Sequence, residues 1–129
     1  MSLVRVSDEV QDALSEGRPI VALESTIIAH GLPRPDNLTA AKRFEDQIRV
    51  AGVTPATVAV LDGVPTVGLS DSQLERIANE DIAKASVRDL PIVMGKGISG
   101  ATTVASTASL ASLVGIRVFA TGGLGGVHR

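Results

Sequence analysis

The sequence predicts an α/β fold, with α/β/α layers around a largely parallel or mixed sheet. Short apolar runs of strand length alternate with longer segments in which apolar residues recur at helical spacing. The length of 129 residues and the hydrophobic content of 44% suit one unit with a modest core. We therefore expect residues 1–129 to form a single domain without internal repeats.

The N-terminal elements are a helix, a strand and a long loop. Ser7 is the predicted cap of a short helix that extends to Leu14 and ends at Gly17. Residues 19–23 are apolar throughout, which predicts a buried strand. Residues 25–37 contain Gly31, Pro33 and Pro35, and this composition predicts an irregular loop of a length that is often functional.

A second helix follows that loop. Asp36 and Asn37 are its candidate caps, and Gly52 is its predicted stop signal. Its apolar face is formed by residues at helical spacing, namely Ala41, Phe44, Ile48 and Ala51.

The middle of the chain predicts a hairpin and a third helix. Residues 56–61 form the second predicted strand, and the Asp62-Gly63 pair turns the chain so that residues 66–67 pair back. Residues 70–73 have the Ser-x-x-Gln spacing of a capping box. The helix behind this capping box is expected to end near Glu80.

Two more strands and one more helix complete the predicted order. Residues 90–94 form a third predicted buried strand, and residues 95–100 a glycine-rich turn. Thr102 or Thr103 opens a helix, and residues 118–120 form the fourth predicted strand. This alternation predicts the sheet described above.

Composition favours a small-molecule site over other functions. The net charge is −2 without a basic block, and Phe44 and Phe119 are the only aromatic residues, so a nucleic-acid surface is not expected. The chain has no cysteine, and its first residues are charged, which predicts a cytoplasmic protein. Residues 97–116 are uncharged but contain seven Ser or Thr, so no membrane span is expected.

Three unusual segments should lie at the carboxyl ends of strands, where open α/β sheets bind ligands. They are residues 24–33, 95–103 and 121–129. The second leads directly into a helix whose first amides can bind a phosphate. The alternative is that the glycines in these segments only permit tight turns.

Glu24 is the leading candidate for an acid or base. A carboxyl group at the end of an apolar strand is partly desolvated, which raises its pKa toward useful values. The alternative roles are a helix cap or a surface ion pair. Lys84 and Lys96 are expected to be solvated, although Lys96 lies in the glycine turn, where it could approach a phosphate.

Two histidines, His30 and His128, lie in glycine-containing loops. Without cysteines nearby they do not specify a metal site, and each suits a loop hydrogen bond equally well.

Several segments resemble pseudouridine-5′-phosphate glycosidases, and they cover nearly the whole chain from Ser7 onward. Residues 22–31, Ala-Leu-Glu-Ser-Thr-Ile-Ile-Ala-His-Gly, are similar to the opening signature of that family, and residues 100–107, Gly-Ala-Thr-Thr-Val-Ala-Ser-Thr, are similarly specific. Further similar segments are residues 55–59, residues 63–64 together with 67–70, and residues 88–91 and 119–129. Val87 and the Ile98-Ser99 pair depart from the family pattern.

The resemblance implies reversible cleavage of the carbon-carbon bond between uracil and ribose 5-phosphate, the chemistry of a lyase or glycosidase. It implies that Glu24 is the proton donor and that Lys84, Thr103 and the backbone at Val104 bind substrate. Thr121 is implied to lie in a loop that lines the same pocket.

The resemblance also implies a homotrimer with a divalent metal, usually manganese. The nucleophilic lysine and the metal-binding aspartate of the family follow Arg129, so this chain is expected to be the N-terminal part of a longer domain. The implied partners are the nucleotide substrate and the C-terminal remainder of the protein. The other hypothesis is a non-catalytic phosphate-binding module, or an inactive fragment of the enzyme.

Overall fold

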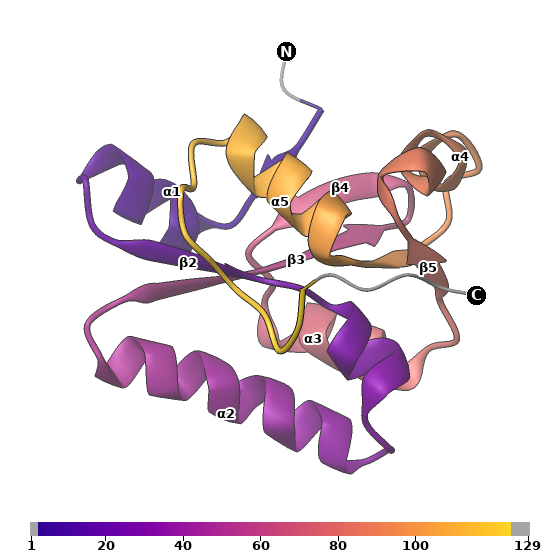
Figure 1. Cartoon of the computed structure of the whole chain (residues 1–129), viewed down its shortest axis with the longest axis horizontal. Coiled ribbons are helices and arrows are strands. Elements are labelled where there is room, and N and C mark those ends of the chain that lie inside the picture. Colours follow the sequence, from indigo (N-terminus) through magenta and orange to yellow (C-terminus); the bar gives the residue numbers. More distant parts are fainter. Residues whose placement is uncertain (1–2, 125–129) are drawn as a thin grey trace.

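The computed structural model describes residues 3–124 as helices on both faces of a mixed sheet (Figure 1). The strands are β1 (Arg5–Val6), β2 (Ile20–Leu23), β3 (Thr54–Leu61), β4 (Val64–Val67), β5 (Ala83–Ala85), β6 (Gly100–Thr102) and β7 (Phe119–Ala120). The α-helices are α1 (Asp8–Ser15), α2 (Asp36–Val50), α3 (Asp71–Asn79), α4 (Leu90–Gly95) and α5 (Val104–Leu113). A π-helical turn, η1 (Ile27–Gly31), and a 3₁₀ turn, η2 (Val87–Asp89), complete the elements.

The sheet has the strand order β1-β4-β3-β2-β7, and β6 pairs with both β3 and β5. Parallel pairing joins β1 to β4, β2 to β3, β2 to β7 and β5 to β6. Antiparallel pairing joins β3 to β4 and to β6. The predicted α/β fold with a mixed, mostly parallel sheet is confirmed.

Strand β3 is the centre of the molecule because both of its faces are covered. All eight of its residues are buried. Val58 and Val60 pack toward α1, α4 and α5, whereas Ala59 and Leu61 pack toward α2 and α3. The two sets of helices lie above and below the sheet in Figure 1. Burial on both faces explains why this strand is a continuous apolar run in the sequence.

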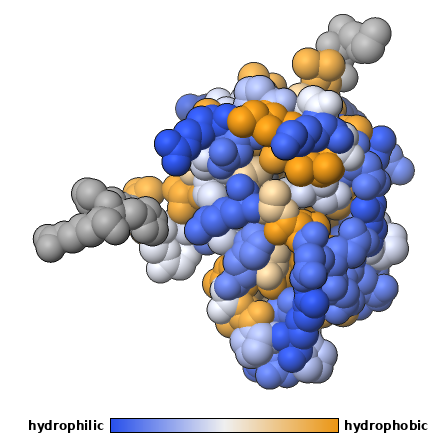
Figure 2. All heavy atoms as spheres, turned by 90° about the vertical axis from the view of Figure 1, so that its right-hand side faces the viewer, coloured by the Kyte–Doolittle hydropathy of each residue, from blue (hydrophilic) through white to orange (hydrophobic). Residues whose placement is uncertain are grey.

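Residues 90–94 are helical, so the predicted strand there is wrong. A short apolar run has no decisive period, and here Leu90 and Val93, three residues apart, are buried while Ile92 is exposed. Pro91 lies in the first turn of α4, where a missing N–H costs nothing. The side of the molecule that carries α4 and β5 is mostly hydrophilic at its surface, with small apolar patches (Figure 2).

Strands β5 and β6 occupy segments in which no strand was predicted. β6 lies partly in the segment predicted as a glycine turn, and Gly100 is tightly packed, since a Cβ there would lie 3.0 Å from Ala85 Cβ. Each of these strands has only three residues, so neither carries a readable pattern.

The predicted loop of residues 25–37 contains the helical turn η1. Asn37, a predicted cap, is instead buried inside α2, where its Nδ2 donates to the carbonyl oxygens of Ile28 (3.0 Å) and Ala78 (2.7 Å). Asp36 is the first residue of α2 and does not cap it. The caps of the helices beginning after Ser7 and Ser70 are confirmed.

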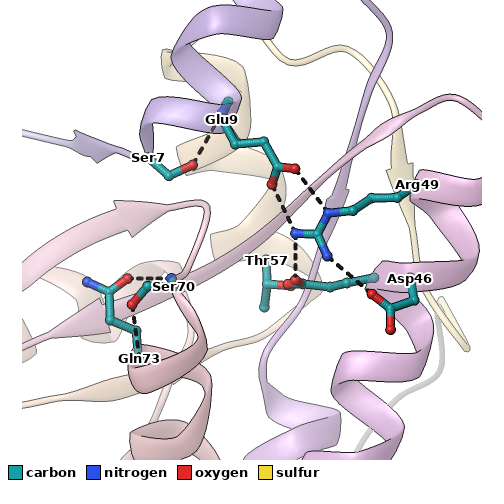
Figure 3. A network of polar contacts seen from close by, with 9 residues as sticks. Ser7, Glu9, Asp46, Arg49, Thr57, Ser70 and Gln73 are labelled. Carbon is teal, nitrogen blue, oxygen red and sulfur yellow. Dashed lines mark hydrogen bonds and ion pairs between the residues drawn. The ribbon is translucent and has the colours of Figure 1, made fainter.

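An ionic network ties α1 and α2 to β3 (Figure 3). Thr57 Oγ1 donates to the buried Glu45 carboxylate over 2.6 Å, and Arg49 donates to Glu45 and, through two nitrogens, to Glu9. Burial raises the pKa of Glu45, and the Thr57 and Arg49 contacts offset part of this effect. Hydrogen bonding from Arg49 lowers the pKa of Glu9.

Replacing Gly68 by alanine is expected to destabilise the protein more than the same change at Gly52. Both glycines have positive φ, 89° and 82°, so each alanine costs about 1–2 kcal/mol of backbone strain. At Gly68 the new Cβ would also lie 2.8 Å from Val10 Cγ2, whereas nothing lies within 4 Å at Gly52. Overpacking adds roughly 1–3 kcal/mol at Gly68. Urea denaturation of the two full-length variants measures the difference, and equal losses would contradict this packing of α1.

None of the helices within residues 3–124 combines the length and apolar character that a membrane span requires.

Candidate functional site

The candidate site lies at the carboxyl end of β2. This strand has neighbours on both sides, β3 and β7. Helix α2 follows β2 on one face of the sheet, and α5 packs against β2 from the other face (Figure 1). The two neighbours of β2 are thus connected through helices on opposite faces, α2 before β3 and α5 before β7. The end of such a strand is the usual place for a ligand in an α/β sheet.

Strands β2 and β6 approach each other end to end along the same side of β3. β2 pairs with residues 54–57 of β3, and β6 runs in the opposite direction beside Ala59 and Val60. The carboxyl ends of both strands therefore meet near Val58. We expected Glu24 and the start of α5 to share a carboxyl edge of parallel strands; they do lie together, but because two antiparallel strands converge.

A polar cavity of about 510 Å³ opens at this junction. Four sequence-predicted site residues line it: Glu24, Lys84, Thr103 and Val104. Its remaining lining residues are Thr26, Ser86, Arg88, Asp89, Ala105, Gly123 and Leu124. Lys84 comes from β5, and Thr103 immediately precedes α5.

The cavity is lined by charges of both signs, the cations of Lys84 and Arg88 and the carboxylates of Glu24 and Asp89. Within the described part of the chain, neither Lys84 nor Arg88 forms an ion pair. The carboxylate of Asp89 accepts hydrogen bonds from Ser86 N (3.1 Å) and Ser86 Oγ (2.6 Å), which lower the pKa of Asp89. Val104 and Ala105, the first two residues of α5, also line the cavity, and the first amides of a helix have no partners within it.

Glu24 also borders a second, apolar hollow of about 460 Å³. Its walls include Leu23, Ile27, Phe44 and Ile48. Thr121 lines this hollow rather than the polar cavity, and its Oγ1 donates to Glu24 Oε1 over 3.3 Å. The half-buried Glu24 carboxylate therefore lies between a polar and an apolar space.

Other candidates lie away from the cavity. Lys96 follows α4 and is exposed outside both spaces that Glu24 borders. His30 Nε2 lies 2.9 Å from the Ile82 carbonyl oxygen, which is the loop hydrogen bond considered above. His128 lies outside the described residues. Among residues 3–124, Glu24 forms no ion pair and caps no helix.

Sequence reasoning did not single out Arg88 as a site residue. The available signal was its position four residues after Lys84, with Ser86 between them, and only β5 and η2 fold these residues around one cavity. Within residues 3–124, no group of three or more His, Asp or Glu could hold a metal ion. The metal ligand that the resemblance implies lies beyond Arg129, outside the described residues.

The structure is thus an α/β protein in which a strand-end carboxylate lies in the same cavity as two cations and a helix N-terminus. The family model described as indigoidine synthase A like protein matches residues 9–129. The chain belongs to that family.

The relatives include proteins named pseudouridine-5′-phosphate glycosidase. That of Frankia alni is 62% identical over 99% of this chain, which covers 36% of the relative. That of Saccharopolyspora erythraea is 60% identical over 99% of this chain and 43% of its own length. That of Escherichia coli is 54% identical over 98% of this chain and 41% of its own length. The resemblance noted in the sequence is confirmed, and the chain spans about two fifths of the length of these relatives.

Two crystal structures share the fold. The prealnumycin C-glycosynthase AlnA, in complex with ribulose 5-phosphate, has a TM-score of 0.86 and 44% identity over 99% of this chain and 41% of its own. The indigoidine synthase A-like protein of Thermotoga maritima has a TM-score of 0.85 and 33% identity over 100% of this chain and 43% of its own.

Proposed function

We propose that the full-length protein is a pseudouridine-5′-phosphate glycosidase, which reversibly cleaves the carbon-carbon bond between uracil and ribose 5-phosphate. The observation that carries the proposal is the position of Glu24 on the wall of a cavity lined by Lys84, Arg88 and the start of α5. One cavity thus combines a proton donor with groups that bind a phosphate. The names and identities of the relatives support the same activity.

The phosphate is proposed to bind between Lys84, Arg88, the Thr103 hydroxyl and the amide of Val104. Two cations and a helix N-terminus together stabilise a dianion better than either does alone. The ribulose 5-phosphate in the AlnA crystal structure is a sugar phosphate, which supports a ligand of this class here.

Glu24 is proposed to deliver the proton to uracil. Uracil leaves through carbon, which has no lone pair to protonate, so the acid must be positioned at the base carbon itself. The hydrogen bond from Thr121 fixes one oxygen of the Glu24 carboxylate, and this is the role we assign to Thr121. Positioned acids of this kind contribute about 10² to 10⁴ in rate.

Other parts of the proposed enzyme belong to the C-terminal remainder. The resemblance assigns to that remainder the lysine that forms an imine with C1′ of the ring-opened ribose, and the ligand of the manganese ion. It also supports a cytoplasmic homotrimer. The apolar hollow beside β7, lined by Phe44 and Ile48, is the surface on which we place the remainder.

A second candidate is a non-catalytic phosphate-binding module. The phosphate-binding groups named above all lie within this chain, whereas the proposed nucleophile does not. A protein that lacked the remainder could therefore bind a phosphate without catalysing the reaction. Uracil release by the full-length protein distinguishes the two candidates.

In the full-length protein, Lys84→Gln and Arg88→Gln should each raise KM for pseudouridine 5′-phosphate by about 10- to 100-fold, the value of a charge-assisted hydrogen bond. Any turnover of unphosphorylated pseudouridine should stay unchanged, because that substrate has no phosphate for these cations to bind. Lys96→Gln, which removes an exposed lysine outside the cavity, is the matched control. Steady-state uracil release measures the effect, and unchanged KM in both variants would overturn the phosphate site.

A further inference from the structure

A group of buried hydroxyls joins the two strand ends beneath the candidate site. Ser25, Thr102, Ser106 and Thr107 are all completely buried. Thr102 N donates to Ser25 Oγ over 2.8 Å, and the two side-chain oxygens lie 3.3 Å apart. Thr102 Oγ1 donates to the Val58 carbonyl oxygen over 2.7 Å and accepts from Thr107 Oγ1 over 2.8 Å.

The directions of these hydrogen bonds follow from the number of hydroxyl protons. Thr102 Oγ1 has one proton and donates it in a hydrogen bond to the Val58 carbonyl oxygen, so Thr102 Oγ1 accepts hydrogen bonds from Ser25 and Thr107. Thr26 Oγ1 donates to the carbonyl oxygen of Thr102 over 2.7 Å. Thr102 therefore contacts its surroundings through its amide, its carbonyl and its hydroxyl.

These contacts lie where backbone pairing stops. The β2 ladder ends at Thr57 and the β6 ladder begins at Ala59, so Val58 faces the gap between them. The hydroxyls of Ser25 and Thr102 bridge that gap. Ser25 directly follows Glu24, and Thr102 directly precedes Thr103, so the bridge connects the proposed proton donor to the proposed phosphate site.

The phosphate side has a separate attachment. Ser106 Oγ donates to the Ala85 carbonyl oxygen over 2.6 Å, which fixes α5 to β5. Lys84 lies in β5, and backbone pairing of Ala85 with Thr102 also joins β5 to β6. Neither this pairing nor the Ser106 bond requires the Thr102 hydroxyl. Loss of the Thr102 hydroxyl should therefore shift Glu24 relative to an intact phosphate site.

We propose that Thr102 and Ser25 are positioning residues that set the place of the Glu24 carboxylate relative to the phosphate-binding start of α5. This inference rests on the proposed function for its catalytic consequence. The structural coupling that it asserts is measurable without activity.

The kinetic test uses the full-length enzyme with Thr102→Val, which keeps the side-chain shape and removes the hydroxyl. We expect kcat to fall by about 10- to 100-fold, the effect of a misplacement near 1 Å. The Kd for ribose 5-phosphate should stay close to its original value, and Thr102→Ser should restore most of kcat. Thr66→Val is the matched control, because Thr66 is also buried, and within residues 3–124 its hydroxyl donates only to the nearby Val64 carbonyl oxygen.

The structural test is amide hydrogen exchange on the same variants. Thr102→Val should accelerate exchange at residues 24–26, whereas Thr66→Val should not. Failure of the wild-type protein to release uracil would reject the proposed function alone, since the exchange comparison still reports the coupling. The inference is overturned if Thr102→Val keeps kcat, if it loses kcat and phosphate affinity equally, or if exchange at residues 24–26 is unchanged.

Discussion

We expect the 129-residue chain alone to release no uracil from pseudouridine 5′-phosphate, and we expect activity only when the proposed remainder of the protein is supplied. The chemical reason is the proposed position of the nucleophilic lysine outside this chain, without which the covalent route is lost entirely. The structural reason is the apolar hollow beside Glu24, with Phe44 and Ile48 in its wall, which in our proposal the remainder covers.

The assay compares four samples in manganese-containing buffer: this chain, the remainder, both fragments co-expressed, and the full-length protein. Only the last two should turn over substrate. The isolated chain should also aggregate, because Val118 and Leu124 are 57% and 82% exposed next to a short edge strand. Robust turnover by the isolated chain would show that the nucleophile has been placed wrongly.

Glu24→Gln in the full-length protein should lower kcat by about 10² to 10⁴. Glutamine has nearly the same shape and can still accept the Thr121 hydrogen bond, but it has no proton to deliver to the uracil carbon. Since the phosphate-binding groups are untouched, the Kd for ribose 5-phosphate should change little. Single-turnover uracil release and calorimetric binding separate the two effects.

The control for that experiment is Glu75→Gln, which alters an exposed carboxylate on α3 whose one ion pair within residues 3–124 is with Lys42, at 3.9 Å. It should leave kcat unchanged. If Glu24→Gln behaved in the same way, Glu24 could not be the proton donor.

Most of the fold is predictable from the sequence where local chemistry decides it. Ser7 and Ser70 cap their helices as their spacing indicates, and β3 is recognisable because burial on both faces requires an apolar run. The segment 90–94 is equally apolar, yet it is a helix. Its secondary structure depends on which of its side chains the neighbouring elements cover, and the sequence of the segment does not show this. β5 and β6 exist only through pairing with distant strands.

The candidate site divides in the same way. Glu24 is identifiable as a polar residue at the end of an apolar strand, and the helix start near Thr103 as a place for a phosphate, whereas Lys84 became a candidate only through family resemblance. Arg88 and the buried hydroxyls have no local signature. Their significance depends on the end-to-end approach of β2 and β6, which no periodicity encodes.

That approach also has a consequence for how the chain folds. Ser25 and Thr102 are 77 positions apart, so their contact closes a long loop, whereas the β3-β4 hairpin forms between neighbours in the sequence. Contacts of long sequence separation form slowly, because the entropy of closure must be spent before they stabilise anything. Glu24 should therefore acquire its surroundings only after β6 and α5 have docked, so we expect the site to form later than the central hairpin.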